Sequence, residues 1–314
     1  MKLQARYPAL VGAALLALHA AGLAAPKETG NQQFGVIGHS FSQNGGEARL
    51  DHSLAKTRGA GLSFVVATGV KGPAEPCSDT LYTHRRDMFD DVRAPVVVVP
   101  AASDWAECRN AAGRRDGIER LNRLRELLYS EPSALGKKPL MLARQSANAK
   151  YRSYAENSYW IAGNVLYATV NIPSNNNHYR PEAGRNSEFE DRAVANRYWL
   201  NRLFALAKRR KFDALVLFTE GNLKILSEEP GLLARLGRSA PTQQDGFAAP
   251  RRQIVGMAAK FPGKVLLIDT APVANGTEPV IAWRANLGHV SIGSRAVHVH
   301  VTPQSEPLFR LEQP

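Results

Sequence analysis

Polar side chains that could take part in chemistry follow several apolar segments of this sequence. His39 comes directly after the apolar segment 34–38, and Asp104 follows a run of four valines after a short loop. Asn176 and His178 lie in a polar loop behind another apolar segment. Imidazole, carboxylate and amide groups can ligate a metal ion or transfer protons. Because α/β proteins bind ligands at the carboxyl ends of their strands, these four side chains are candidates for one cleft.

Each of these signals also has a purely structural interpretation. A lone histidine such as His39 commonly makes a hydrogen bond within a loop, and the asparagines of "SNNNH" suit a turn. His298 and His300 alternate with valines in "VHVHV", which predicts a half-buried strand with both rings on a solvent-facing side. The sequence contains no nucleophile elbow, P-loop or dinucleotide-binding glycine pattern.

The elements that must position these side chains alternate between strand and helix over the first hundred residues. Apolar runs predict buried strands at 34–38, 62–68 and 96–99, with helices at 47–60 and 79–92 between them. This alternation favours an α/β fold with parallel strands. Similar elements follow, namely helices at 117–129 and 187–211, a strand pair at 159–172, strands at 213–219 and 264–269, and short strands from 280 onward. No repeat or low-complexity segment interrupts them, so residues 25–314 are expected to form one domain.

The first 24 residues are typical of an export signal. Lys2 and Arg6 precede an apolar run at 10–23, and small residues suit cleavage after Ala24. A membrane anchor is the alternative, but the run is short for a span and contains His19. We therefore expect a periplasmic or secreted protein without a later membrane-spanning segment. In that compartment the two cysteines, Cys77 and Cys108, are expected to form a disulfide.

The chain is basic, with 40 lysines and arginines against 28 acidic residues and a net charge of +12. Signal removal leaves 38 basic residues, so the net charge becomes +10. A solvated basic surface explains this charge without a ligand, whereas an anionic small ligand or an acidic envelope partner would make use of it. No basic motif with interleaved aromatic residues occurs, so a nucleic-acid partner is not expected.

Taken together, the segments resemble an exported bacterial branch of the calcineurin-like metallophosphoesterases. The resemblance covers nearly all of the mature chain and depends on order and spacing, with these main carriers: "FGVIGHSF", "FVVATGVKGPAEPCSDTLY", "VVVVPAASDWAEC", "AENSYWIAGNVLYATVNIPSNNN" and "AVHVHVTPQSEPLF". It implies a four-layer α/β/β/α sandwich. It also implies a site in which two metal ions activate a water and hold the phosphate.

The departures from this family fall on the expected metal ligands. His39 stands where the first aspartate belongs, and Val70 stands where the bridging aspartate belongs. Ala102 and Ser103 occupy the positions of an Asp-Asn pair, and no histidine pair follows the strand at 264–269. Hard divalent cations need several charged oxygens together, so the resemblance predicts loss of the dinuclear site.

The resemblance therefore implies an exported pseudoenzyme that binds a partner and needs no cofactor. The alternative is a surviving metal-dependent hydrolase that holds one Mn, Zn or Fe ion on the four candidate side chains His39, Asp104, Asn176 and His178. A purely structural envelope protein is a third possibility, with the cleft filled by side chains such as Val70 and Trp105.

Overall fold

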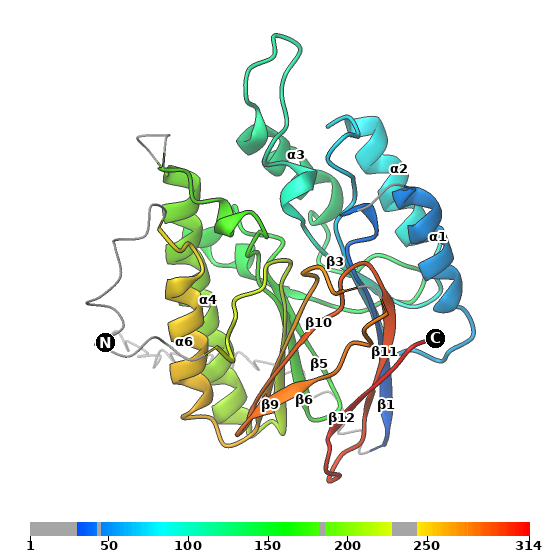
Figure 1. The fold of residues 1–314 in the computed structure, drawn as a ribbon, viewed down its shortest axis with the longest axis vertical. Helices are drawn as coiled ribbons and strands as arrows, with labels where there is room; N and C mark the ends of the chain where they lie inside the picture. The colour runs from blue at the N-terminus through cyan, green and yellow to red at the C-terminus, as the bar shows by residue number, and fades with distance from the viewer. Residues whose placement is uncertain (1–29, 43–44, 182–185, 228–243, 275) are drawn as a thin grey trace, which may run out of the picture.

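The computed structural model describes residues 30–42, 45–181, 186–227, 244–274 and 276–314. These residues form a mixed α/β fold with two mixed sheets and five α-helices, which confirms the predicted class (Figure 1). The expected export signal at 1–24 lies outside the described residues. Among the described residues, no helix has both the length and the apolar character that crossing a membrane requires.

The first sheet has the strand order β12-β11-β1-β2-β3. Strands β1, β2 and β3 run parallel, as the strand–helix alternation predicts, while β11 pairs antiparallel with both β1 and β12. The carboxyl ends of the three parallel strands, and the loops that follow them, therefore share one edge. The bounds of the strands are β1 Gln32–Ile37, β2 Val65–Thr68, β3 Val96–Val99, β11 Ala296–Val301 and β12 Phe309–Glu312.

The second sheet has the order β4-β5-β6-β7-β8-β10-β9. Its four central strands β6, β7, β8 and β10 are parallel, and β5 and β6 form the hairpin expected around Gly163 and Asn164. This sheet therefore also gathers its strand-end loops at one edge. The bounds are β4 Ala143–Arg144, β5 Ser158–Ala162, β6 Val165–Thr169, β7 Ala214–Phe218, β8 Lys264–Asp269, β9 Ala282–Arg284 and β10 Leu287–Ser291.

The helices flank the two sheets. Helices α1 (Gly46–Lys56), α2 (Asp79–Asp90) and α3 (Gly117–Leu128) lie on one side of the strands, and α4 (Ser187–Arg210) and α6 (Ala248–Ala258) lie on the other (Figure 1). Most of these helices end within a few residues of the expected positions. The first is shorter than predicted: it ends at Lys56, and the positive φ of Gly59 does not allow the helix to continue to residue 60.

Three apolar clusters hold these elements together. The largest contains buried residues of both sheets, among them Val36, Val97, Val216 and Leu266. A second cluster joins the second sheet to α4 and α6, and a third joins the first sheet to α1, α2 and α3. The opposite faces of both sheets are therefore covered, which explains why their strands are apolar on both sides.

The solvent exposure of two side chains differs from the sequence expectation. The helical periodicity of 117–129 predicts Ile118 on one apolar face with Leu121, Leu124 and Leu128. In the structure Ile118 is 53% exposed, and only the three leucines of α3 are buried. His298 was expected to face solvent, but it is only 6% exposed. Because the valines of β11 fill the core between the sheets, His298 points to the opposite face, which the helices cover.

A disulfide joins Cys77 to Cys108, as the sequence predicts. Cys77 precedes α2, whose first turn is capped by the hydroxyl of Ser78 accepting a hydrogen bond from the Leu81 N–H. Cys108 lies in the segment that follows β3. The disulfide therefore ties together the loops that follow two neighbouring parallel strands, at the edge where the candidate side chains lie.

Candidate functional site

At the carboxyl edge of the strands, three polar side chains connect the two sheets. His39 follows β1, Ser103 follows β3, and Glu220 follows β7 of the second sheet. The Ser103 Oγ lies 3.1 Å from the His39 Nε2, and the His39 Nδ1 lies 3.8 Å from the Glu220 Oε1. His39 and Glu220 are both buried. The two sheets thus meet through a polar contact where a parallel α/β protein usually binds its ligand.

Protein donors occupy both oxygens of Glu220. The Oε2 accepts hydrogen bonds from the backbone N–H groups of Ala102, at 2.7 Å, and Ser174, at 2.8 Å, while the Oε1 accepts the Ser174 hydroxyl at 2.9 Å. Burial raises the pKa of Glu220, and the same burial lowers the pKa of His39, whereas the attraction between the two groups acts in the opposite direction. Sequence reasoning missed Glu220, although it follows a buried strand just as Asp104 does.

Asp104 is fully buried and holds two strand-end loops by their backbones. Its Oδ1 accepts the N–H groups of Val70, at 2.9 Å, and Lys71, at 3.1 Å, and its Oδ2 accepts the N–H of Ala101 at 2.7 Å. Burial raises its pKa to about 6, against these three hydrogen bonds, which favour the charged form. Asp104 is therefore an internal acceptor of the loops after β2 and β3 and does not line an open cleft.

A buried lysine lies beside Asp104. Lys71 is 2% exposed, and its ammonium donates to the carbonyl of Gly72 at 2.7 Å and to the carbonyl of Ser103 at 2.8 Å. Burial lowers the pKa of Lys71, while the negative charge of Asp104 acts to raise it. The Ser103 hydroxyl also donates to the Lys71 carbonyl, at 2.9 Å. We call His39, Lys71, Ser103, Asp104 and Glu220 the buried polar network.

The loop after β2 presents a glycine, and not Val70, to this network. Val70 is fully buried in the apolar cluster that includes Phe41 and Tyr82. A Cβ added at Gly69 would lie 2.5 Å from the His39 Cδ2 and 3.1 Å from the Ala101 Cβ. The His39 ring therefore fills the space into which a side chain at position 69 would project. Val70, expected to stand for a bridging ligand, is directed elsewhere.

The remaining candidates, Asn176 and His178, lie apart from the buried polar network. Asn176 donates to the Gln244 carbonyl and accepts the Gly246 N–H, both at 2.9 Å, so it fastens its loop to the segment before α6. The His178 ring lies 4.5 Å from the ring of Trp105. The structure therefore brings His39 near Asp104 but does not gather the four candidate side chains into a single cleft.

The buried polar network does not fit a divalent cation. The oxygens of Asp104 and Glu220 accept N–H and O–H donors, and the His39 Nε2 faces the Ser103 hydroxyl. The buried ammonium of Lys71 adds a positive charge where a dication would need compensating anions. Within the described ranges, no group of three or more His, Cys, Asp or Glu side chains is arranged to hold a metal ion.

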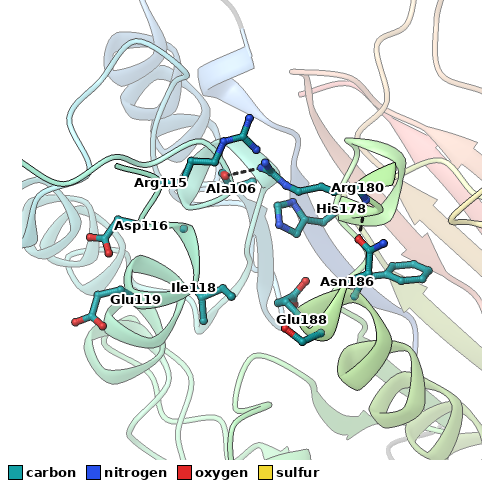
Figure 2. Close-up of a pocket in the computed structure, with 12 residues that line it drawn as sticks. Ala106, Arg115, Asp116, Ile118, Glu119, His178, Arg180, Asn186 and Glu188 are labelled. Atoms are coloured by element: carbon teal, nitrogen blue, oxygen red, sulfur yellow. Dashed lines mark hydrogen bonds between the residues drawn. The ribbon is translucent and has the colours of Figure 1, made fainter. Parts of the chain in front are cut away.

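An open pocket lies beside His178, between the first turns of α3 and α4 (Figure 2). Its volume is about 300 Å³. On one wall Arg180 donates to the carbonyl of Ala106 at 3.0 Å and pairs with Glu107 at 2.8 Å. Arg115, on another wall, is exposed and makes no ion pair with any described residue. We call this the α3–α4 pocket.

The α3–α4 pocket has features that suit a negatively charged group, mixed with acidic residues. The N-cap residues Asp116 and Asn186 make no side-chain capping bond, so the first N–H groups of both helices lack that partner. The acidic lining residue Glu188 pairs with Arg192 through two hydrogen bonds of 2.7 and 3.0 Å. Burial lowers the pKa of His178, so its ring gains charge only in acidic solution.

No protein-family model matches this chain, and a search of curated proteins finds none that is similar to it in sequence. Its function has to be inferred from its residues and their geometry.

Proposed function

We propose that this chain is an exported protein with the architecture of the calcineurin-like metallophosphoesterases, and that it acts by binding and not by phosphoester hydrolysis. Residues 25–314 would form its single mature domain after removal of the signal at 1–24. The disulfide between Cys77 and Cys108 supports an oxidising compartment, such as the periplasm or the extracellular medium.

The four-layer α/β/β/α form of this architecture is supported by the three apolar clusters. One cluster packs sheet against sheet, and the other two each pack helices against one sheet. These contacts support the proposed order helix, sheet, sheet, helix. The position of the buried polar network, at the carboxyl edge of both sheets, is the position where the resembled enzymes hold their metals.

The observation that carries the proposal is that protein donors engage every acceptor of the buried carboxylates. Asp104 and Glu220 together accept six hydrogen bonds from N–H and O–H groups. These donors lie in the loops after β2, β3 and β6, so a metal could replace them only if those loops moved. A mononuclear hydrolase using His39, Asp104, Asn176 and His178 has no support in the geometry, because these side chains do not converge.

The α3–α4 pocket is the surface through which we propose that binding occurs. Arg115, Arg180 and the two helix starts suit an anionic group, and the exposed Ile118 with Phe189 suits an apolar part. A small ligand with one anionic group and an apolar body would use both. The acidic residues at the rim would disfavour ligands with a second negative charge at that end.

Replacing Arg115 with alanine tests this assignment, with sulfate as the probe because its charge is constant between pH 5 and 8. We expect the variant to bind sulfate about five- to tenfold more weakly in a calorimetric titration at low ionic strength, because one charge-assisted hydrogen bond is lost. Arg114→Ala is the matched control, since Arg114 is the neighbouring exposed arginine and lies outside the pocket lining. Equal weakening by both changes would reject the pocket as the site.

Sulfate binding at the α3–α4 pocket should strengthen as the pH falls. Burial lowers the pKa of His178, so its ring is neutral at pH 7.5. The ring adds positive charge only at a pH below the usual pKa of histidine. We expect a two- to fivefold gain in affinity between pH 7.5 and 5.5. A His178→Asn variant should lose this gain, and an unchanged pH dependence in that variant would contradict a role for His178.

A further inference from the structure

We infer that a second site binds a phosphate-bearing anion. This site lies on the side of the sheets that carries α1, α2 and α3. The site is a groove of about 400 Å³ between α1 and the start of β11. It goes beyond the proposed function, because it shares no residue with the α3–α4 pocket. We call it the basic groove, and its polar lining side chains include Arg49, His52, Ser53, Lys56, Ser294 and Arg295.

The spacing of the basic residues explains how one groove collects them. Arg49, His52 and Lys56 are separated by three and four positions on α1, so they form one stripe along the helix. Arg295 comes from the other wall, immediately before β11. None of the groove's lining residues, all of which belong to the described part of the chain, is acidic.

Neither of the two acidic residues of α1 lines the groove, since Asp51 is exposed to solvent and Glu47 has partners on α2. Glu47, in the first turn of this helix, forms ion pairs with Arg85 and His84 of α2. It therefore neutralises positive charge at the α1–α2 contact and not in the basic groove. The lining of the groove therefore combines the positive charges of Lys56 and Arg295 with no acidic side chain, so an anion bound there would be stabilised electrostatically.

The hydroxyl of Ser53 adds a further hydrogen-bond donor to the lining of the groove. Ser53 lines the groove and is 6% exposed. Arg295 donates one side-chain hydrogen bond, at 3.3 Å to the Ala274 carbonyl, and keeps further N–H groups for other acceptors. Phosphate oxygens accept from guanidinium, ammonium and hydroxyl donors, so phosphate matches the donors that the groove offers.

Two sources could supply this phosphate group, the headgroup of an anionic phospholipid or a soluble phosphate. We would measure sedimentation of the full mature protein with phosphatidylcholine vesicles that contain phosphatidylglycerol, and with pure phosphatidylcholine vesicles. Inorganic phosphate, titrated by calorimetry, is the second probe. The test variant is Lys56→Gln with Arg295→Gln. The control variant is Arg252→Gln with Lys260→Gln, which removes the same charge from the exposed surface at α6.

We expect the test variant to bind its anion about thirtyfold more weakly, which corresponds to two basic side chains at a charged surface. The control variant should bind as the wild type does. Binding of anionic vesicles alone would identify a lipid headgroup, and binding of inorganic phosphate would identify a soluble ligand. The inference is overturned if the wild type binds neither probe, or if the control variant weakens binding as much as the test variant.

Discussion

Replacing Glu220 with alanine is expected to lower the free energy of unfolding by about 3–5 kcal/mol. Glu220 is 3% exposed and accepts the N–H groups of Ala102 and Ser174 as well as the Ser174 hydroxyl. Its removal leaves the buried N–H of Ala102 without an acceptor, removes the acceptor of the Ser174 N–H and hydroxyl, and takes away the negative partner of His39. Glu220 links a loop of the first sheet to a loop of the second at the carboxyl edge, beside other contacts such as that of Arg180 with Ala106.

Urea unfolding at pH 7 measures this effect. Glu190→Ala is the control, because Glu190 is an exposed glutamate near the start of α4. Its loss should change the free energy of unfolding by no more than about 0.5 kcal/mol. If the free energy of unfolding of Glu220→Ala lies within about 0.5 kcal/mol of the wild-type value, the buried polar network does not hold the sheets together.

Removing the disulfide by changing both Cys77 and Cys108 to alanine should cost about 4 kcal/mol. The disulfide closes a loop across a sequence separation of 31 residues, and opening it frees that segment in the unfolded chain. The loss can be measured by chemical denaturation of the double variant beside the oxidised wild type.

Measuring stability with and without a reductant separates the effect of the disulfide bond from the effect of packing by the two cysteine side chains. Dithiothreitol should lower the free energy of unfolding of the wild type to about that of the double variant. It should leave the free energy of unfolding of the double variant unchanged. A wild type whose stability is insensitive to complete reduction would show that the loops after β2 and β3 are held by their other contacts, such as those of Asp104.

Much of the fold follows from the sequence because it depends on local patterns. The run Val96–Val99 is a buried strand with the predicted bounds, and the alternation of strands and helices leads to parallel pairing. The exposure of Ile118 and of His298 differs from the sequence expectation for one reason. Periodicity identifies residues that share a face, but whether another layer covers that face depends on residues far away in the sequence.

The candidate site could be predicted only in part. His39 and Asp104 were recognised because each follows an apolar strand. Glu220 was missed, because its role depends on the meeting of two sheets whose strands lie far apart in the sequence. The function of Asp104 as an acceptor for three backbone N–H groups depends on the path of two loops, which spacing does not reveal.

Metal content tests the central claim most directly, namely that a hydrogen-bonded network stands where a dinuclear centre would lie. The mature protein would be purified from an oxidising compartment and dialysed against trace manganese, zinc and iron. Metal per chain would then be determined by elemental mass spectrometry. The network predicts less than about 0.1 equivalent of any of these metals. One or two equivalents, lost when His39 and Asp104 are changed to alanine, would contradict the claim and support a metal-dependent hydrolase.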